Sequence, residues 1–420
     1  MRSLGRLQPA AGICPPTKGS VSAKRVLHVE VGGEYGGSLR ALQLYLAGAD
    51  DSLKHDVLFY YPTPGSEPVR SLAGRTDTLF LQSPAPRRPS NGLGRSSRTS
   101  WLLPVWRTIW PFIHLAKQLP LALRLRKKIE RGKYDLVHVN NTFWFQPATL
   151  LAAWLAGKPV VVHVRNAVDK TFFNRWLASL TDGIACVNPI QAAEISHFVR
   201  VPVRVCRDPI GKPEVNEHAA AALRSDLSGD GGILVGSIGR LHAQKGYEFF
   251  IRAAARVRER WKDISFVIAG DGEEREPLER LVRELGLDGK FHLLGFRHDA
   301  ATVLASFDIF VCSSLWEGLP LSVLEAMQLG KPIISTPVGV EPEFLSPQSG
   351  VVIVPSADFE KLAEAIVVLA RDSDLRIRMG TTVKQASYSF NDNSSIREFD
   401  RFLFETGTSP KVKTSSSVRA

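Results

Sequence analysis

Two glutamates stand eight positions apart in the stretch SSLWEGLPLSVLEAMQLGKPIIS, residues 313–335. Glu317 precedes a Gly-Leu-Pro turn, and Glu325 lies within an apolar run of helical spacing. Pro320 is well placed as the first helical residue, because the N–H group that proline lacks would be unpaired there anyway. The helix then ends before Gly330, which can adopt the left-handed conformation of a helix stop.

A helix start between two carboxylates suits a particular kind of ligand. The free N–H groups and the positive dipole end of a helix favour a phosphate, and carboxylates accept hydrogen bonds from hydroxyl groups. A phosphate with a hydroxylated ring on each side describes a sugar nucleotide, with Glu317 facing the sugar and Glu325 facing the ribose. The alternative is structural, with Glu317 capping the helix and Glu325 an ordinary solvated residue.

Two cations stand at another strand end, earlier in the chain. In GSIGRLHAQKGYEFF, Arg240 follows a strand and Lys245 begins the next helix. An arginine fork and a lysine ammonium at the carboxyl end of a strand suit a diphosphate. The following strand ends in IAGDGEE, where Gly272 and its neighbours let the backbone approach a ligand closely. Each loop alone could be an ordinary connection, but the three in succession favour one binding site.

These loops belong to a regular alternation of short apolar strands and helices. One array begins with RVLHVEV at 25–31, and a second begins with GILVGSIGR at 232–240. Residues 207–231 between them are polar and carry no strand pattern, which indicates a linker and a domain boundary. Such alternation predicts two parallel sheets with ligands bound beyond the carboxyl ends of their strands. The expected site is therefore the cleft between the two arrays.

Composition narrows the function classes. The chain has 420 residues, with 53 Lys and Arg against 42 Asp and Glu, an excess that suits an anionic ligand, a nucleic acid or an anionic membrane, or simply solubility. No zinc-finger or RNP-like pattern supports a nucleic acid. The four cysteines have neither metal-ligand nor CxxC spacing, which disfavours a zinc or disulfide framework and fits a reducing cytosol. We expect no signal peptide and no transmembrane helix, and hence a cytoplasmic protein.

The second half of the chain resembles retaining glycosyltransferases of family 4, also called group 1, which have the GT-B fold. The matching stretches are GRLHAQKG, IAGDGEE, LLGF and SSLWEGLPLSVLEAMQLGKPIISTPVGVEPE, and the likeness runs from about residue 230 to 370. The first half is similar more weakly, through VGGEYGGS and DLVHVN. The glycine cluster lacks GxGxxG spacing and no acidic residue ends the second strand, so a nicotinamide dehydrogenase is disfavoured.

The resemblance implies an α/β chain with two Rossmann-like βαβ domains facing across a cleft and a C-terminal helix crossing back to the first domain. The first domain of this fold usually holds the acceptor and the second the nucleotide sugar. The expected organisation is a mobile N-terminal extension at 1–23, an acceptor-binding domain at 24–211, a nucleotide-sugar-binding domain at 212–388, the crossing helix at 389–405 and a disordered tail at 406–420.

The resemblance also implies residue roles in the donor site. Arg240 and Lys245 would bind the donor diphosphate, and Glu325 would bind the ribose hydroxyls. Glu317 would contact the donor sugar, positioning it and stabilising charge without attacking it. Arg240, Lys245 and Glu317 are thus the candidate catalytic residues. The other expected donor contacts are Gly37, Gly272, Leu294, Gly318, Leu319, Leu321 and Ser322.

On the acceptor side the sequence departs from the family. Many members have a histidine at the end of the strand matching PVVVHVR, where this chain has Arg165, with His163 two residues earlier on the same strand face. Arg165 could bind an anionic acceptor or a donor phosphate, and the alternative for His163 is a buried, hydrogen-bonded histidine. The candidate acceptor residues are Gly36, Asn140, His163 and Arg165.

The resemblance implies transfer of a sugar, with retention of configuration, from a UDP- or GDP-sugar co-substrate to a glycan or lipid-linked acceptor in surface polysaccharide, lipopolysaccharide or glycolipid assembly. We expect no metal and no cofactor, because the two cations and the helix end can stabilise the leaving diphosphate. A donor phosphate oxygen would help to deprotonate the acceptor. Two alternatives stay open: an epimerase or phosphorylase on the same fold, and a catalytically silent membrane-associated scaffold.

Residues 101–133 form a basic segment with three tryptophans and eight Lys or Arg. Pro104, Pro111 and Pro120 predict that it is not one long straight helix. Tryptophan and aliphatic residues flanked by basic ones suit an anionic bilayer surface, which would place the protein peripherally on the inner face of the cytoplasmic membrane. The alternative is a domain helix whose apolar face packs on the sheet.

Overall fold

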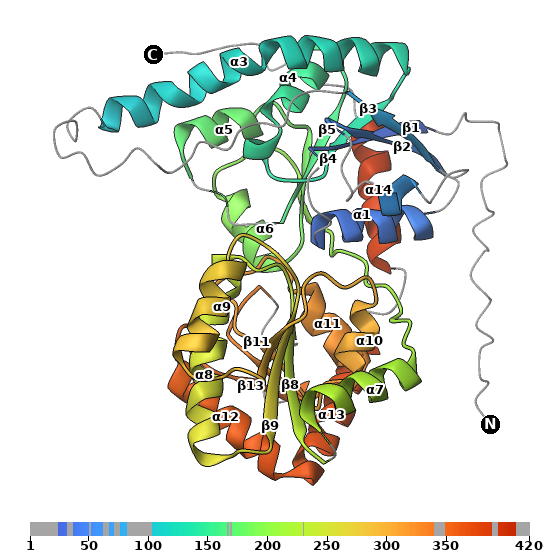
Figure 1. Cartoon of the computed structure of the whole chain (residues 1–420). Helices are drawn as coiled ribbons and strands as arrows, with labels where there is room; N and C mark the ends of the chain where they lie inside the picture. The colour runs from blue at the N-terminus through green and yellow to red at the C-terminus, as the bar shows by residue number, and fades with distance from the viewer. Residues whose placement is uncertain are drawn as a thin grey trace, which may run out of the picture.

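The computed structural model describes residues 24–31, 37–49, 52–61, 67–70, 76–81, 103–165, 168, 170–229, 231–339, 349–388 and 394–408. Two α/β domains lie one above the other, each built on a parallel sheet (Figure 1). The candidate residue Gly36, the extension at 1–23 and the chain beyond 408 lie outside the described residues. The two parallel sheets are those that the alternation of strands and helices predicts.

The N-terminal domain contains a seven-stranded parallel sheet in the order β3-β2-β1-β4-β5-β6-β7. The middle strands are buried throughout, because a parallel sheet covered on both faces needs uninterrupted apolar runs. The strand order reverses between β1 and β4, the kind of point where open α/β sheets bind ligands. The strands are β1 (Lys24–Glu30), β2 (Leu53–Phe59), β3 (Thr76–Phe80), β4 (Leu136–Val139), β5 (Val160–Val164), β6 (Gly183–Cys186) and β7 (Val203–Val205).

Helices cover both faces of this sheet. One apolar cluster joins α3, α4 and α5 to the sheet, and a second joins α1 and the C-terminal helix α14 to its opposite face. The helices of this domain are α1 (Gly37–Gly48), α2 (Glu67–Arg70), α3 (Leu103–Arg131), the 3₁₀ turn η3 (Phe143–Phe145), α4 (Pro147–Leu155), α5 (Phe172–Ala178) and α6 (Pro189–Ser196).

The C-terminal domain repeats this plan with a six-stranded parallel sheet in the order β10-β9-β8-β11-β12-β13. Helices α8, α9 and α12 cover one face, and α7, α10, α11 and α13 cover the other. The strands are β8 (Ile233–Ile238), β9 (Ile264–Ala269), β10 (Phe291–Leu293), β11 (Ile309–Cys312), β12 (Ile333–Ser335) and β13 (Val351–Ile353). The helices are α7 (Glu217–Ser228), η4 (Ala243–Lys245), α8 (Tyr247–Arg260), α9 (Arg275–Glu284), α10 (Ala300–Ala305), α11 (Leu321–Gln328), α12 (Phe359–Arg371) and α13 (Ser373–Ser387).

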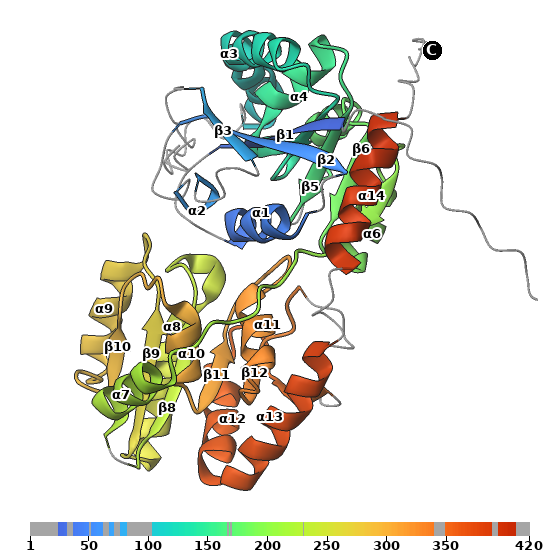
Figure 2. The same ribbon diagram turned by 90° about the vertical axis from the view of Figure 1, so that its right-hand side faces the viewer.

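The C-terminal helix α14 (Ser394–Thr408) crosses back to the N-terminal domain, as expected (Figure 2). Phe399, Phe402 and Leu403 pack there against residues of β1, β2 and α1, so the chain end contributes to the first domain's core. The helix begins five residues later and ends three residues later than the predicted 389–405. Its last turn continues past Glu405 because Thr406 is buried and Thr408 bonds back to the carbonyl of Phe404.

Two predicted segments differ from the structure. Residues 207–231 are only partly a linker, because α7 forms there with Asn216 as its N-cap and Gly229 as its C-cap. Segment 103–131 is one continuous helix in spite of its prolines, a continuity that the prediction of no long straight helix does not include. Pro104 lies in the first turn, where no N–H bond is lost, and farther along the helix Leu115, Leu121 and Leu125 pack into the apolar cluster that α3 shares with α4.

Among the described residues, no helix combines the length and apolar character that crossing a bilayer requires.

Candidate functional site

The loops that follow β8 and β11 lie together at one edge of the C-terminal sheet. The backbone N–H of Leu315 donates to the carbonyl of Gln244 at 2.7 Å, and the Ser313 hydroxyl donates to the carbonyl of Lys245 at 2.9 Å. These two bonds place the segment that carries Lys245 beside the segment that carries Glu317. The cation and the carboxylate singled out in the sequence therefore meet, although 72 positions separate them.

Lys245 and Glu317 form a short ion pair, with Nζ 2.6 Å from Oε1. Ser314 donates its hydroxyl to the same oxygen at 2.8 Å, and Gln244 donates its amide to Oε2 at 3.2 Å. The Glu317 side chain is only 9% exposed. Burial lowers the pKa of the Lys245 ammonium, but the neighbouring acidic groups, Glu317 foremost among them, together raise it above its usual value, so Lys245 stays charged.

The start of α11 is open. Pro320 occupies the N-cap position, one residue earlier than the first helical position predicted for it, because its ψ of 86° is not helical. Among the described residues no side chain caps this helix, and Glu317 bonds elsewhere, so the reading of Glu317 as a helix cap is wrong. Within the described part of the chain, no hydrogen bond engages the backbone N–H groups of Leu321 and Ser322. Such groups at a helix start are suited to bind an anion.

Glycines bring the β8 and β9 loops into backbone contact. A Cβ on Gly270 would lie 1.9 Å from the carbonyl oxygen of Gly239, and one on Gly272 would lie 2.4 Å from that of Leu241. Both glycines have φ near 155°, a conformation that side chains disfavour. In the structure these glycines serve the approach of one loop to another, and the contact of Gly272 with a donor remains a prediction.

The remaining candidate donor residues surround this edge. Arg240 lies two residues beyond the end of β8 and is exposed. Leu294 follows β10, where its N–H bonds the carbonyl of Ile268 at 3.0 Å. Leu319 and Leu321 flank the start of α11 and are packed on the apolar cluster beneath it. The structure thus gathers Arg240, Lys245, Glu317 and the α11 start at one edge of one sheet.

The N-terminal domain contacts this edge directly. A Cβ on Gly318 would lie 1.6 Å from the carbonyl oxygen of Arg165, so only glycine fits between the domains there. Asn188 caps α6 by accepting from the N–H of Gln191 at 2.8 Å, and its amide nitrogen donates to the carbonyl of Gly318 at 2.8 Å. The loop that carries Glu317 is therefore held by the other domain.

A second cross-domain contact involves Glu325. The Arg40 Nε, on α1, donates to Glu325 Oε1 at 3.1 Å. The starts of the two helices face each other, since a Cβ on Gly37 would lie 3.7 Å from Leu321 Cδ1. Burial raises the pKa of Glu325 and Arg40 opposes that rise. The reading of Glu325 as an ordinary solvated residue is therefore wrong, because its side chain is only 17% exposed.

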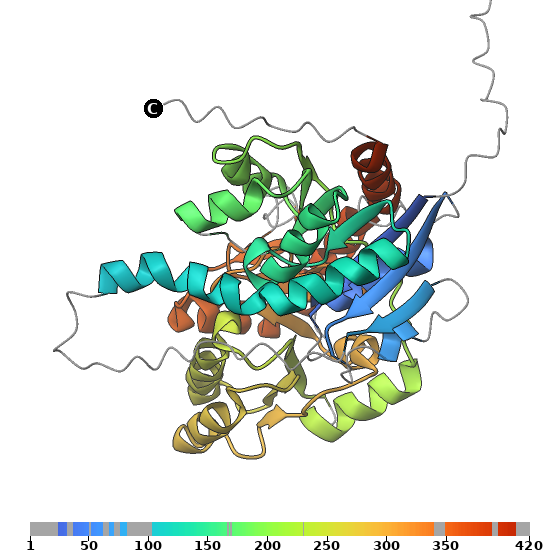
Figure 3. The same ribbon diagram turned by 90° about the horizontal axis from the view of Figure 1, so that it is seen from above.

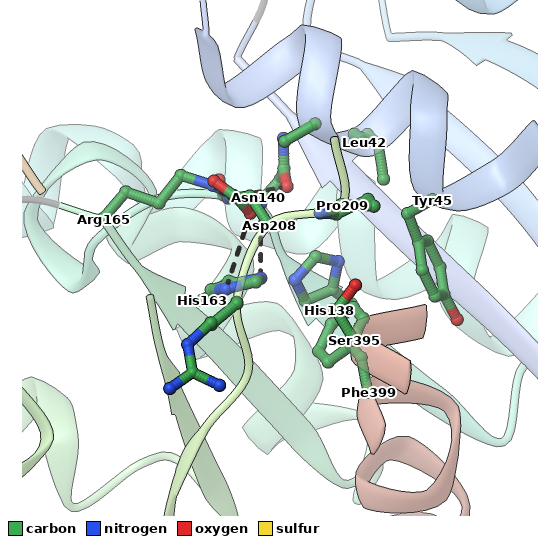
Figure 4. Close-up of a pocket in the computed structure, with 12 residues that line it drawn as sticks. Leu42, Tyr45, His138, Asn140, His163, Arg165, Asp208, Pro209, Ser395 and Phe399 are labelled. Carbon is green, nitrogen blue, oxygen red and sulfur yellow. Dashed lines mark hydrogen bonds and ion pairs between the residues drawn. The ribbon is translucent and has the colours of Figure 1, made fainter. Parts of the chain in front are cut away.

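Three of the candidate acceptor residues line one small pocket beneath α1 and α14 (Figure 4). Arg165 directs its guanidinium at Asp208, with Nε 2.9 Å from Oδ2, and at Asn140, with Nη1 2.9 Å from Oδ1. His163 is buried, with Nε2 3.0 Å from the carbonyl oxygen of Cys206. Burial, followed by the charge of Arg165, holds the pKa of His163 well below its usual range. This is the buried, hydrogen-bonded histidine of the alternative reading, and contact of the three with an acceptor remains a prediction.

Family models match both halves of the chain. The model described as "Glycosyl transferases group 1" matches residues 232–372, and that described as "Glycosyltransferase Family 4" matches residues 44–208. An alpha-D-kanosaminyltransferase of Streptomyces kanamyceticus is 33% identical over 61% of this chain and 73% of its own length. The chain belongs to the family 4 glycosyltransferases.

Two further comparisons extend this assignment. A UDP-Gal:alpha-D-GlcNAc-diphosphoundecaprenol alpha-1,3-galactosyltransferase of Escherichia coli is 28% identical over 63% of this chain and 74% of its own length. The crystal structure of Anabaena HepE in complex with UDP-glucose is 18% identical, covers 91% of this chain and 99% of that one, and has a TM-score of 0.72. With its two parallel sheets and its crossing helix, this glycosyltransferase has the predicted GT-B fold.

Several contact residues of this glycosyltransferase did not emerge from the sequence. Arg40, Asn188 and Gln244 act through contacts that fold-level packing creates, and no local pattern marks them. Glu30 is different, because it is an acidic residue at the end of a strand whose last five residues are buried. It is buried and accepts from the amide of Asn140 at 2.7 Å, and that burial raises its pKa. A carboxylate at the end of a buried strand is a signal that could have found it.

Proposed function

We propose that this glycosyltransferase moves a sugar, with retention of configuration, from a nucleoside-diphosphate sugar to a glycan or lipid-linked acceptor. The Lys245–Glu317 pair beside the open start of α11 carries the proposal. A fixed cation and free backbone N–H groups are partners for phosphate, and a carboxylate is a partner for sugar hydroxyls. No described structural role, such as a helix cap, accounts for placing these groups together at a sheet edge.

The donor orientation follows from the order of these groups. The diphosphate lies among Arg240, Lys245 and the N–H groups of Leu321 and Ser322, the ribose lies toward Glu325 and the transferred sugar lies toward Glu317. Charge on the leaving diphosphate is stabilised by the two cations and by the helix dipole, so the proposed reaction uses no metal and no cofactor. Because its ion pair keeps Lys245 protonated, that stabilisation is present before the bond breaks.

Retention is assigned to a front-face reaction. Glu317 is tied to Lys245, Ser314 and Gln244, an arrangement that suits positioning and charge stabilisation better than attack on the sugar carbon. A donor phosphate oxygen is then the group that takes the proton of the acceptor hydroxyl. Proton NMR of the product tests this step: the anomeric configuration of the donor sugar is expected in the product, and the opposite configuration would contradict the proposal.

Relatives suggest the substrates. The name of the E. coli relative states a UDP-galactose donor and a diphosphoundecaprenol-linked acceptor, and the HepE structure contains UDP-glucose. We therefore place a UDP-sugar first and a GDP-sugar second as donor, and a lipid-linked glycan of surface polysaccharide or lipopolysaccharide assembly as acceptor. A thermal-shift panel of UDP, GDP, ADP and CDP tests the donor class: a shift with UDP or GDP is expected, and no shift with any of them contradicts it.

A lipid-linked acceptor favours a membrane-facing surface, and α3 offers one. Leu119 and Leu123 are each 44% exposed, and Lys117, Arg124 and Lys127 are exposed on the same helix. Seen from above, α3 lies across the outside of the N-terminal domain with α4 and α5 (Figure 3). We propose that this surface binds anionic lipid at the inner face of the cytoplasmic membrane, by apolar insertion and charge attraction.

Vesicle flotation tests this surface with a matched control. Wild type is expected to float with vesicles of phosphatidylglycerol and phosphatidylethanolamine, and Leu119→Glu with Leu123→Glu is expected to stay at the bottom. Val368 on α12 is a control of similar character, apolar and 55% exposed in the other domain, and Val368→Glu should float. Failure of wild type to float, or equal flotation of the double variant, would contradict the membrane proposal and leave the donor site untouched.

A further inference from the structure

Helices α1 and α11 meet across the domain interface with their starts facing each other. Arg40 is three residues into α1, and Glu325 is four residues beyond the first residue of α11. Their side chains are joined by the 3.1 Å bond from Nε to Oε1, across 285 positions of sequence. This ion pair therefore ties the N-terminal domain to the carboxylate that the proposed function assigns to the ribose.

The pair leaves Glu325 able to bind a ligand. A carboxylate has about four acceptor positions on its two oxygens. Among the contacts of the described residues, Arg40 donates to Oε1 of Glu325. The Glu325 side chain is 17% exposed, so part of it is still accessible. Two ribose hydroxyls can therefore donate to the remaining acceptor positions while Arg40 keeps its bond.

We propose that Arg40 is a positioning residue for the nucleotide donor: it holds the Glu325 carboxylate in the orientation that accepts the ribose hydroxyls. Recognition of the ribose then depends on the N-terminal domain, although the carboxylate belongs to the C-terminal domain. This inference rests on the proposed function of the donor site. The family-4 match begins at residue 44, beyond Arg40, so that match assigns no role to this residue.

A bridge that only joined the domains would behave differently. Arg40 is 39% exposed, and an ion pair between partly exposed groups stabilises a fold only slightly. Removal of such a bridge would lower the melting temperature slightly. It would lower the binding affinity of every nucleotide by the same factor. Removal of a positioning residue would weaken only those nucleotides that present a ribose hydroxyl to Glu325.

The test compares nucleotides that differ by one hydroxyl. UDP and 2′-deoxy-UDP (or the GDP pair, where the donor base is guanine) are titrated calorimetrically into wild type and Arg40→Ala. Wild type is expected to prefer the ribonucleotide by about tenfold, since a hydrogen bond to a charged group contributes about 1.5–3 kcal/mol. In Arg40→Ala this ratio should fall to about two or less, while the ratio of UDP to UMP affinity stays unchanged.

Four further variants sharpen the comparison. Arg40→Lys should restore part of the ratio, since an ammonium can reach the same carboxylate. Glu325→Gln should abolish the ratio, and adding Arg40→Ala to it should change the ratio no further, because the two residues act as a unit. Arg204→Ala is the matched control: its 3.0 Å pair with Glu405 joins β7 to α14 in the same domain, away from the donor site, and it should keep the wild-type ratio.

The outcomes separate this inference from the proposed function. A wild-type preference that persists in Arg40→Ala overturns the role of Arg40 alone. Equal wild-type binding of the ribo and deoxy forms also overturns it, since Glu325 would then not read the ribose. Absence of binding by any nucleoside diphosphate to folded wild type overturns the donor site itself, and this inference with it.

Discussion

The two sheets of this glycosyltransferase end in loops of similar composition that are used in opposite ways. At the edge of the C-terminal sheet, Lys245 and Glu317 form a pair beside an open helix start, and Arg240 is exposed. At the edge of the N-terminal sheet, Arg165 and Asp208 form a pair that is 10% and 4% exposed and that also engages Asn140. One edge presents its charges beside free N–H groups, and the other satisfies its charges internally.

The difference shows what decides whether a charged side chain at a strand end is paired within the protein or left exposed. Both arginines follow a buried strand, and residue type and position alone make them equal candidates for an anion. Partners from distant sequence separate them: Asp208 lies 43 positions from Arg165 and occupies its fork. A buried charge is costly without such a partner, whereas an exposed cation is solvated by water and stays available to bind a ligand.

The largest effect is expected from loss of the Lys245–Glu317 pair beside the open start of α11. Glu317→Gln removes the charge that pairs with Lys245 but keeps the shape of the side chain, and it should lower the transfer rate by about 10²–10³-fold at saturating donor. Glu360→Gln, on the exposed face of α12 where Glu360 pairs with Arg256, is the control and should keep the wild-type rate. A loss of less than about threefold in Glu317→Gln would contradict the assignment.

The buried histidines of the N-terminal sheet are expected to make the stability of the fold depend on pH. Burial holds the pKa values of His28, His138 and His163 well below their usual range of about 6.5. The unfolded chain takes up these protons as pH falls below about 6.5, and the folded chain does not until its lower pKa values are reached. Stability should therefore be complete above about pH 6.5 and fall below it, by up to about 1.4 kcal/mol per pH unit for each histidine.

Melting temperatures at pH 7.5, 6.5 and 5.5 measure this effect. His163→Gln should reduce the dependence by about one proton, and His298→Gln, at an exposed histidine of the C-terminal domain, should leave it unchanged. A melting temperature that stayed constant from pH 7.5 to 5.5 would show that the buried histidines do not resist protonation.

Contact between the two edges depends on Gly318. Gly318→Ala places a Cβ 1.6 Å from the carbonyl oxygen of Arg165, so the domains must shift, at a cost of about 1–3 kcal/mol. Gly407→Ala, whose Cβ would meet its neighbours at an ordinary 3.6 Å or more, is the control. Small-angle scattering and transfer rates should both change for Gly318→Ala alone. Identical results for the two variants would mean that the contact is dispensable.

The smallest expected effect compares two helix caps. Asn188 and Asn216 each cap a helix through a 2.8–3.0 Å bond, so alanine at either should cost about 1 kcal/mol of stability. Only Asn188 also holds the carbonyl of Gly318, so only Asn188→Ala should slow transfer, by several-fold. Equal transfer rates in the two variants would show that Asn188 acts only as a helix cap.

Much of the fold could be predicted from sequence, because its signals are local. Uninterrupted apolar runs mark the buried strands, and Gly330 marks a helix stop by a conformation that few other residues adopt. The continuous helix at 103–131 could not be predicted, because Pro120 removes a backbone hydrogen bond while Leu121 and Leu125 beside it pack into an apolar cluster shared with α4. Prediction from sequence fails for elements whose structure depends on contacts with residues far along the chain.

The contacts of the candidate site also fall into those that the sequence could predict and those that it could not. The pairing of Lys245 with Glu317 could be predicted because loops at the carboxyl ends of neighbouring strands converge. The roles of Arg40 and Asn188 could not, because both act on residues more than 100 positions away in the other domain. The pairing of Arg165 with Asp208 could not be predicted either, and contact of Arg165 with an acceptor remains a prediction.

Calorimetric titration of UDP and GDP into wild type and Lys245→Ala tests the central claim most directly, which is that a nucleoside diphosphate binds at the start of α11 beside Lys245. We predict saturable binding of one of the two nucleotides to wild type, and an affinity at least about tenfold lower in Lys245→Ala, since a charge-assisted hydrogen bond contributes about 1.5–3 kcal/mol. Equal affinities in the two folded proteins, or no binding of either nucleotide to wild type, would contradict the account.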